Sequence, residues 1–183
     1  MVPHFNAPKQ AATQYYGPRG KHRMFALGRY IAQLYLSPSD LLIGIIGDAG
    51  SGKSSLIRGM FPGLELTNDD DGVNVRPLPI LERDDTKAFF SPHTYHVDVR
   101  FEQAFTQMPV LAEAIKDALK DGKRVVVEHF ELIYPFLGMN ANLLIGVGQM
   151  VTVVRPTIFG PEPQELAEHA FAKLKVRLMA HSA

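Results

Sequence analysis

One eight-residue stretch of the sequence is compatible with few folds. Residues 47–54 read G-D-A-G-S-G-K-S and match the whole Walker A pattern, G-x-x-x-x-G-K-[ST]. Such a loop turns backbone N–H groups toward a chain of phosphates, and the positive end of the following helix points at the same anions. An apolar run, residues 41–46, precedes the loop, and residues 54–58 have the pattern of a helix start. Strand, glycine-rich loop and helix are the context that this motif requires. The alternative to a phosphate-binding loop is a Gly/Ser-rich surface turn.

The motif assigns most of the expected contacts to a nucleotide. Lys53 is expected to reach the β- and γ-phosphates, and the Ser54 hydroxyl is expected to bind Mg²⁺. Gly50 and Gly52 allow the backbone to approach the ligand closely. The expected nucleotide-binding residues form one continuous segment. They are Gly47, Asp48, Ala49, Gly50, Ser51, Gly52, Lys53, Ser54 and Ser55.

A second acidic residue is expected to hold the metal ion or its water. Glu128 ends the β-branched run at residues 124–128, and an acid at the end of a buried strand faces the phosphates across the sheet edge. The alternative is that Glu128 is an ordinary acid at the end of a strand, with no role in metal binding. Asp98, which ends a shorter strand, is the second candidate, and its alternative is a surface pair with Arg100. We therefore expect Lys53, Glu128 and Asp98 to be catalytic, and Ser54 and Glu128 to bind the metal.

The order of predicted elements favours one α/β domain. Strands are expected at residues 41–46, 94–99, 124–128, 143–147 and 150–154. Helices are expected at residues 24–36, 54–58, 109–120, about 130–137 and about 163–179. Alternating strands and helices predict a mainly parallel sheet with right-handed crossovers. The prediction is the three-layer α/β sandwich of P-loop NTPases, residues 22–183, with N-terminal and C-terminal helical extensions and a flexible arm at residues 1–21.

The composition limits the cellular compartment and the classes of partner that we expect for this protein. The 183 residues have a formal net charge of +0, so no global field attracts nucleic acid or a membrane. The chain contains no Cys, which excludes disulfides and thiolate metal sites and suits a reducing compartment. No signal pattern opens the sequence, and no apolar run reaches the roughly 20 residues of a membrane helix. We expect a cytoplasmic protein with no membrane contact.

Three further groups of residues are candidate sites. The acidic run at residues 69–71 fits no EF-hand, because the twelfth position holds Leu78, so a solvated loop is favoured. His93, His96 and Asp98 suggest a zinc site, but His93 should lie on the opposite strand face from the other two. Basic residues near both termini suggest a patch, against the alternative of a solvated helix face and an arm. They are Lys9, Arg19, Lys21, Arg23, Lys173, Lys175 and Arg177.

Several segments resemble the TsaE family, the small bacterial P-loop ATPases of tRNA threonylcarbamoyladenosine biosynthesis. Residues 47–55 are similar to that family's G-D-x-G-[AS]-G-K-T-T loop, and residues 57–60 to its next helical segment. Residues 95–100 resemble its Y-H-x-D-x-Y-R strand, although one residue and the second Tyr are missing. Residues 127–129 resemble its apolar-E-W segment, with His129 in place of Trp. The T-S-P-T switch is not found, and the family lacks the terminal helices predicted here. The resemblance implies that Ser54 and Glu128 handle Mg²⁺, that Asp98 lies near the γ-phosphate, and that partners belong to a tRNA-modifying complex.

A second resemblance extends over nearly the whole chain. Residues 61–69, 127–130 and 179–183 are similar to bacterial P-loop proteins labelled as containing the second additional domain of alanyl-tRNA synthetase. That label implies a zinc-dependent editing module. We do not carry this activity over, because His181 is the first plausible ligand and no Cys is present.

The leading functional prediction is an ATP-binding protein with slow Mg²⁺-dependent hydrolysis whose nucleotide state controls a partner. Arg76, Arg83 and Arg100 are the candidates for an arginine finger. One alternative is a small-molecule kinase that binds its acceptor near Asp98 and Arg100, although the stretch near Arg155 is short and apolar for a lid. The other is a nucleotide-sensing RNA-binding accessory with little turnover.

Overall fold

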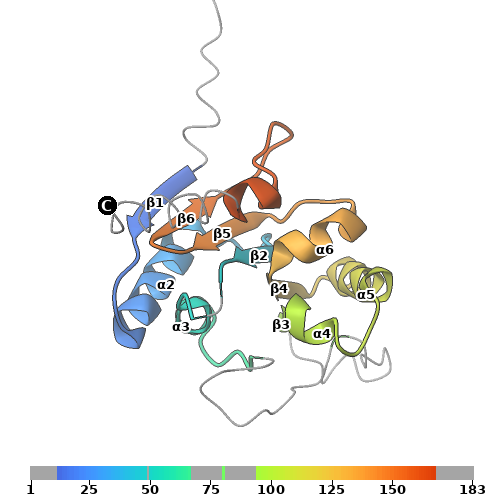
Figure 1. The fold of residues 1–183 in the computed structure, drawn as a ribbon, viewed down its shortest axis with the longest axis horizontal. Helices are drawn as coiled ribbons and strands as arrows, with labels where there is room; N and C mark the ends of the chain where they lie inside the picture. The colour runs from blue at the N-terminus through green and yellow to red at the C-terminus, as the bar shows by residue number, and fades with distance from the viewer. Residues whose placement is uncertain (1–11, 49, 67–79, 81–93, 168–183) are drawn as a thin grey trace, which may run out of the picture.

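The chain forms an α/β fold with a mainly parallel sheet at its centre (Figure 1). The computed structural model describes residues 12–48, 50–66, 80 and 94–167. In these residues the sheet has six strands in the order β1-β6-β5-β2-β4-β3. The strands are β1 (Ala12–Tyr16), β2 (Leu42–Ile46), β3 (Thr94–Asp98), β4 (Arg124–Glu128), β5 (Leu143–Val147) and β6 (Met150–Val154). The helices are α2 (Lys21–Tyr35), α3 (Lys53–Met60), α4 (Val99–Glu102), α5 (Met108–Lys120) and α6 (Phe130–Leu137).

The parallel part of the sheet confirms the predicted strands β2, β3, β4 and β5. Strand β2 lies between β4 and β5 and runs parallel to both, and β3 adds to β4 in the same direction. β6 returns antiparallel to β5, and β1 pairs antiparallel with β6. Every residue of β2 is buried, as expected for a strand covered on both faces. The carboxyl ends of the four parallel strands therefore meet at one edge of the sheet.

Helices cover both faces of the sheet and give two separate apolar cores. Side chains alternate along each strand, so Val126 of β4 faces one core while Val125 and Val127 face the other. The core that contains Val126 packs under α2 and α3, and the core that contains Val125 packs under α5 and α6. Helix α5 forms as predicted, with Pro109 in its first turn and Gly122 just after its end.

Helices α2 and α3 pack with their backbones in close contact. A Cβ atom at Gly28 would lie 2.2 Å from the carbonyl oxygen of Leu56, and one at Gly59 would lie 2.1 Å from that of Phe25. Any side chain at either position would force the helices apart. Because α3 begins at Lys53, this contact fixes the start of α3 against the first turn of α2, where Met24 packs on Gly52.

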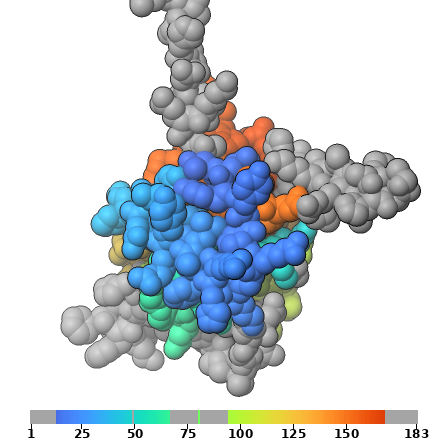
Figure 2. Space-filling view, turned by 90° about the vertical axis from the view of Figure 1, so that its left-hand side faces the viewer, coloured from blue at the N-terminus to red at the C-terminus, as the bar shows by residue number. Residues whose placement is uncertain are grey.

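The segment before α2 differs from the sequence prediction. Residues 12–16, which we assigned to a flexible arm, form the edge strand β1. The Tyr15 and Tyr35 hydroxyls lie 2.8 Å apart, and the Gly17 N–H donates to the Gln149 carbonyl at 2.9 Å. These contacts join β1 to the last residue of α2 and to the β5–β6 turn, which is distant from β1 in sequence. Figure 2 shows the residues of β1 and α2, in blue, covering this side of the molecule.

Several predicted segments lie partly or wholly outside the described residues. They are residues 1–11, Ala49, most of the irregular stretch at 64–92 and residues 168–183. The predicted C-terminal helix is seen as its first turns, residues 163–167.

Candidate nucleotide-binding site

The glycine-rich loop lies between β2 and α3, at the sheet edge where the parallel strands end. Gly50 has φ of 75° and Gly52 has φ of 95°, a left-handed conformation that L side chains rarely adopt. Gly52 also caps the start of α3 without any side-chain hydrogen bond to its first amides. The first N–H groups of α3 thus remain available to an anion.

Lys53 begins α3 and is buried, with its side chain folded back along the loop. Its Nζ atom donates to the Asp48 carbonyl at 2.5 Å. Burial lowers the pKa of Lys53, and the carboxylates of Glu128 and Asp98 partly offset this effect. The Lys53 ammonium group therefore lies beside two acids and the glycine-rich loop, with a backbone carbonyl as its hydrogen-bond acceptor.

Asp98 and Glu128 end neighbouring strands at the same level. They are paired in the β3–β4 register, and Glu128 pairs on its other side with Ile45 of β2. Because Glu128 lies two residues after Val126, it shares the sheet face covered by α3. The topology therefore places the Glu128 carboxylate on the strand next to β2, which leads into the loop. The Asp98 carboxylate lies one strand further from the loop.

The two carboxylates have different partners. His96 Nε2 lies 2.8 Å from Glu128 Oε2, and both side chains are buried. Burial raises the pKa of Glu128, but the hydrogen bond from His96 and the nearby positive charges outweigh it and lower the pKa overall. Asp98 instead accepts the Phe101 N–H at 3.2 Å and so caps α4. The buried Glu128 carboxylate stays ionised at neutral pH, as a metal site requires.

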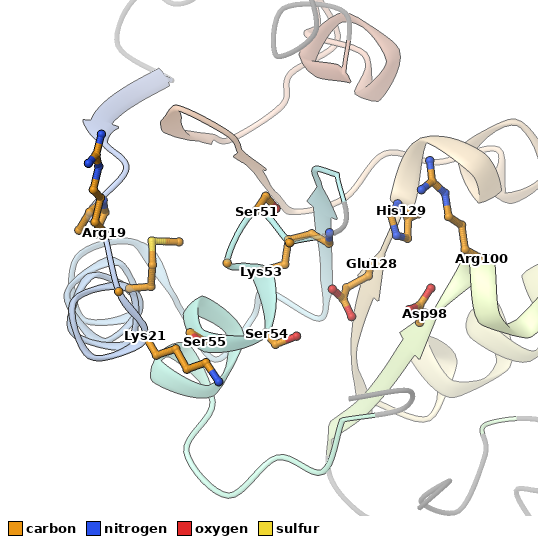
Figure 3. Close-up of a pocket in the computed structure, with 15 residues that line it drawn as sticks. Arg19, Lys21, Ser51, Lys53, Ser54, Ser55, Asp98, Arg100, Glu128 and His129 are labelled. Carbon is orange, nitrogen blue, oxygen red and sulfur yellow. The ribbon is translucent and has the colours of Figure 1, made fainter. Parts of the chain in front are cut away.

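Lys53, Asp98 and Glu128 line one cavity of about 630 Å³. Figure 3 shows Lys53 on the loop side, facing Glu128, Asp98, Arg100 and His129 across the cavity. Arg19 and Lys21 line the other side, next to the start of α2. The cavity combines a cationic loop, two carboxylates and flanking cations, a combination suited to a polyanion together with a divalent cation.

His129 has an unusual backbone and environment. It follows Glu128 directly, with φ of 55° and ψ of 44°, and in the described part of the chain no other non-glycine residue has positive φ. Burial, and then the Lys53 ammonium, lower the pKa of His129. Burial also raises the pKa of Glu131, whose Oε1 atom lies 3.9 Å from His129 Nδ1.

The structure brings most of the predicted site residues together. Gly50, Ser51, Gly52, Lys53, Ser54 and Ser55 line the cavity with Asp98 and Glu128. Gly47 and Asp48 precede them on the loop, and Ala49 lies outside the described residues. Of the candidate arginine fingers, Arg100 lines the cavity, while Arg76 and Arg83 lie outside the described residues.

Sequence reasoning missed two features of the cavity. It assigned Arg19 and Lys21 to a basic patch or a solvated arm, whereas the pairing of β1 with β6 and the packing of α2 on α3 bring them to the cavity beside the loop. It treated His129 only as a replacement for Trp, although a His directly after a strand-terminal acid was a usable signal. Arg100 forms no salt bridge with Asp98 among the described residues, so the structure does not contain the surface pair considered as the alternative for Asp98.

The residues at this site fit magnesium better than a metal held by protein ligands alone. In the described ranges, no group of three His, Asp or Glu side chains is placed to hold a metal ion. Mg²⁺ commonly takes one or two protein oxygens and completes its shell with phosphates and water. Ser54 and the ionised Glu128 supply that number on facing sides of the cavity. His96 is bound to Glu128, and His93, the third residue of the suggested zinc site, is outside the described residues.

A comparison with protein-family models finds no match to this chain, and a comparison with curated proteins also finds none. Among the described helices, none has both the length and the apolar character needed to cross a membrane.

Proposed function

We propose that this protein is a P-loop NTPase that binds ATP with Mg²⁺ and hydrolyses it slowly. The observation that carries the proposal is the meeting of the Walker A loop, Lys53, Ser54 and Glu128 around one cavity. The mainly parallel sheet, with helices on both of its faces, is compatible with the three-layer sandwich predicted from the sequence and supports the proposal. We infer ATP rather than GTP because the sequence has no N-K-x-D segment for reading guanine.

Each residue has a role that follows from its position. Lys53 and the loop amides neutralise the phosphates, and Ser54 with Glu128 holds Mg²⁺ directly or through water. When bound, Mg²⁺ would neutralise charge that develops between the β- and γ-phosphates. His96 keeps the Glu128 carboxylate oriented and ionised. Positioning and charge neutralisation supply most of the catalysis in this class of reaction.

A small-molecule kinase is the second candidate, favoured by the position of Asp98 and Arg100. Both line the cavity on the side of Lys53 away from Arg19, where an acceptor would meet the terminal phosphate. Arg155 does not serve as a lid residue here, because its guanidinium binds Asp40 before β2, at the opposite edge of the sheet. This removes one of the expected kinase parts and leaves hydrolysis as the first proposal.

We also propose a partner, and this part of the proposal rests on the resemblance to TsaE-type ATPases. A protein or tRNA-containing complex that reads the nucleotide state is the partner we propose to look for. Affinity capture from cell extract, with and without ATP and Mg²⁺, tests it. Enrichment of the same tRNA or protein only with ATP supports it, and identical recovery in both conditions contradicts it.

One experiment separates the two reactions. Release of free phosphate from ATP and Mg²⁺ is followed with and without a mixture of small metabolites. We expect slow release that the mixture does not change. ATP consumption that depends on the mixture, with the phosphate appearing on a metabolite, would favour the kinase. Absence of both binding and turnover would contradict the proposed function.

A further inference from the structure

The backbone at His129 is held in a conformation that residues other than glycine seldom adopt. His, with Asn and Asp, tolerates this left-handed region better than other side chains, and such positions gather at functional sites. His129 lies at the junction of β4 and α6, directly after Glu128. Its side chain makes no capping hydrogen bond to α6, so helix capping does not explain the residue.

The imidazole ring has an unmet hydrogen-bonding need. Its Nδ1 atom is buried and has no hydrogen-bond partner, and His129 as a whole is 5% exposed. The nearest acid is Glu131, whose Oε1 atom is 3.9 Å from Nδ1, beyond hydrogen-bond distance. Glu131 Oε2 is also buried without a partner. Buried polar atoms normally have hydrogen-bond partners. The two neighbouring atoms without partners therefore indicate that these side chains gain hydrogen bonds in another state of the site.

The ring is also placed where a reaction would need it. His129 lines the cavity with Lys53, Glu128 and Arg100, and Figure 3 shows it across from Lys53. Nδ1 is enclosed while the residue lines the cavity, so we infer that the ring meets a ligand through its Nε2 edge. Lys53 and Ser54 already serve the phosphates and the metal, so the ring is left for the group that attacks the terminal phosphate.

We propose that His129 is a positioning residue for the nucleophile, which is water in hydrolysis or a hydroxyl group of an acceptor. The inference rests on the proposed function and deepens it. Nε2 hydrogen-bonds the attacking oxygen beside the terminal phosphate. Glu131 closes the short gap to Nδ1 and fixes the ring when the nucleotide is bound. Apo geometry with a long contact is common for such pairs, which tighten only in the complex.

The test compares four variants in single-turnover phosphate release and in Mg-ATP affinity. H129A is expected to lower the rate about 10²-fold, as for other lost preorganised contacts, while the dissociation constant stays within about threefold. H129N keeps a hydrogen-bonding side chain that tolerates the left-handed backbone, and we expect it to recover at least tenfold of that loss. E131A is expected to lower the rate about tenfold. Y95F is the matched control, because Tyr95 Oη is also buried without a partner but Tyr95 does not line the cavity.

Three outcomes would overturn the inference. The first is an H129A rate within twofold of the wild-type rate. The second is an equal loss of rate and affinity in H129A and H129N, which would indicate a structural role. The third concerns the case in which thermal melting shows that H129A is unfolded. An E131A rate equal to the rate of the Y95F control would then contradict the proposed pairing of Glu131 with His129. A wild-type protein that binds no Mg-ATP would overturn the proposed function itself, and this inference with it. Normal binding and turnover with an unaffected H129A would overturn only the inference.

Discussion

His96 Nε2 and Glu128 Oε2 lie 2.8 Å apart in the interior, joining the middle of β3 to the end of β4. The two residues lie diagonally across neighbouring parallel strands and share the face covered by α3. One hydrogen bond therefore links the sheet that supports the site to the carboxylate proposed to hold the metal. Catalytic and metal-binding acids commonly depend on such supporting contacts.

Replacing His96 with Phe should destabilise the protein. The change leaves the buried Glu128 carboxylate without its hydrogen-bond donor, a loss expected to cost about 1–3 kcal/mol. Urea unfolding of H96F, E128Q and the double variant measures the coupling between the two side chains. A coupling energy near zero would show that the contact contributes nothing to stability.

Replacing Glu128 with Gln should separate binding from turnover. The amide keeps the size of the side chain but removes the charge that handles Mg²⁺, so we expect phosphate release to fall about 10²-fold while Mg-ATP affinity is nearly kept. Single-turnover phosphate release and calorimetric titration give the two quantities. Turnover at the wild-type rate in E128Q, together with its loss in D98N, would transfer the metal-handling role to Asp98.

Adding a methyl group at the α2–α3 contact should destabilise the protein. It should also disturb the glycine-rich loop, because this contact fixes the start of α3. G28A or G59A places a Cβ atom 2.2 or 2.1 Å from a backbone carbonyl oxygen, and overpacking of this kind typically costs about 1–3 kcal/mol. Gly146 is the control, because a Cβ atom there meets its nearest neighbour at 3.4 Å, an ordinary contact. If G28A and G59A unfold at the same urea concentration as G146A, the close packing described here is wrong.

Acid should remove the stabilisation that Asp40 provides. The hydrogen bond from Arg155 holds the pKa of Asp40 below its ordinary value of 3.8, against the opposing effect of burial. A lowered folded-state pKa stabilises the protein above the unfolded-state pKa, and this contribution is lost as pH falls through the folded-state value. D40N should therefore lower stability at about pH 7 and lose much of that difference by about pH 3.

Urea unfolding of the wild type and D40N across this pH range measures the effect. D117N, a change at an exposed residue of α5, is the control. A D40N difference that is constant with pH would contradict the assignment.

The central strands could be predicted from sequence because each carries its own signal. Residues 143–147 and 150–154 were expected as strands and are β5 and β6 with the same limits. Runs of buried β-branched residues and a helix with Pro at its start and Gly after its end are local patterns, and local patterns survive folding when tertiary packing agrees with them.

What the sequence missed depends on contacts between distant segments. Residues 12–16 carry a weak strand signal, and they become a strand because β6 offers an unpaired edge. Arg19 follows β1 in the chain and lines the cavity beside the loop, a position that depends on that pairing and on the packing of α2 against α3. The His96–Glu128 contact likewise depends on the β3–β4 register, which no local pattern specifies. The loop residues were predictable because the Walker A motif encodes its own geometry.

Titration of Mg-ATP into wild type and K53A tests the central claim most directly. Removing the Lys53 ammonium leaves the phosphates without the charge that the buried side chain provides, so we expect affinity to fall at least about 10²-fold with the melting temperature nearly unchanged. K116A, a change at a lysine of α5 that pairs with Glu113, should bind like wild type. A wild-type protein that binds no Mg-ATP, or a K53A variant that binds it as tightly as wild type, would contradict the account.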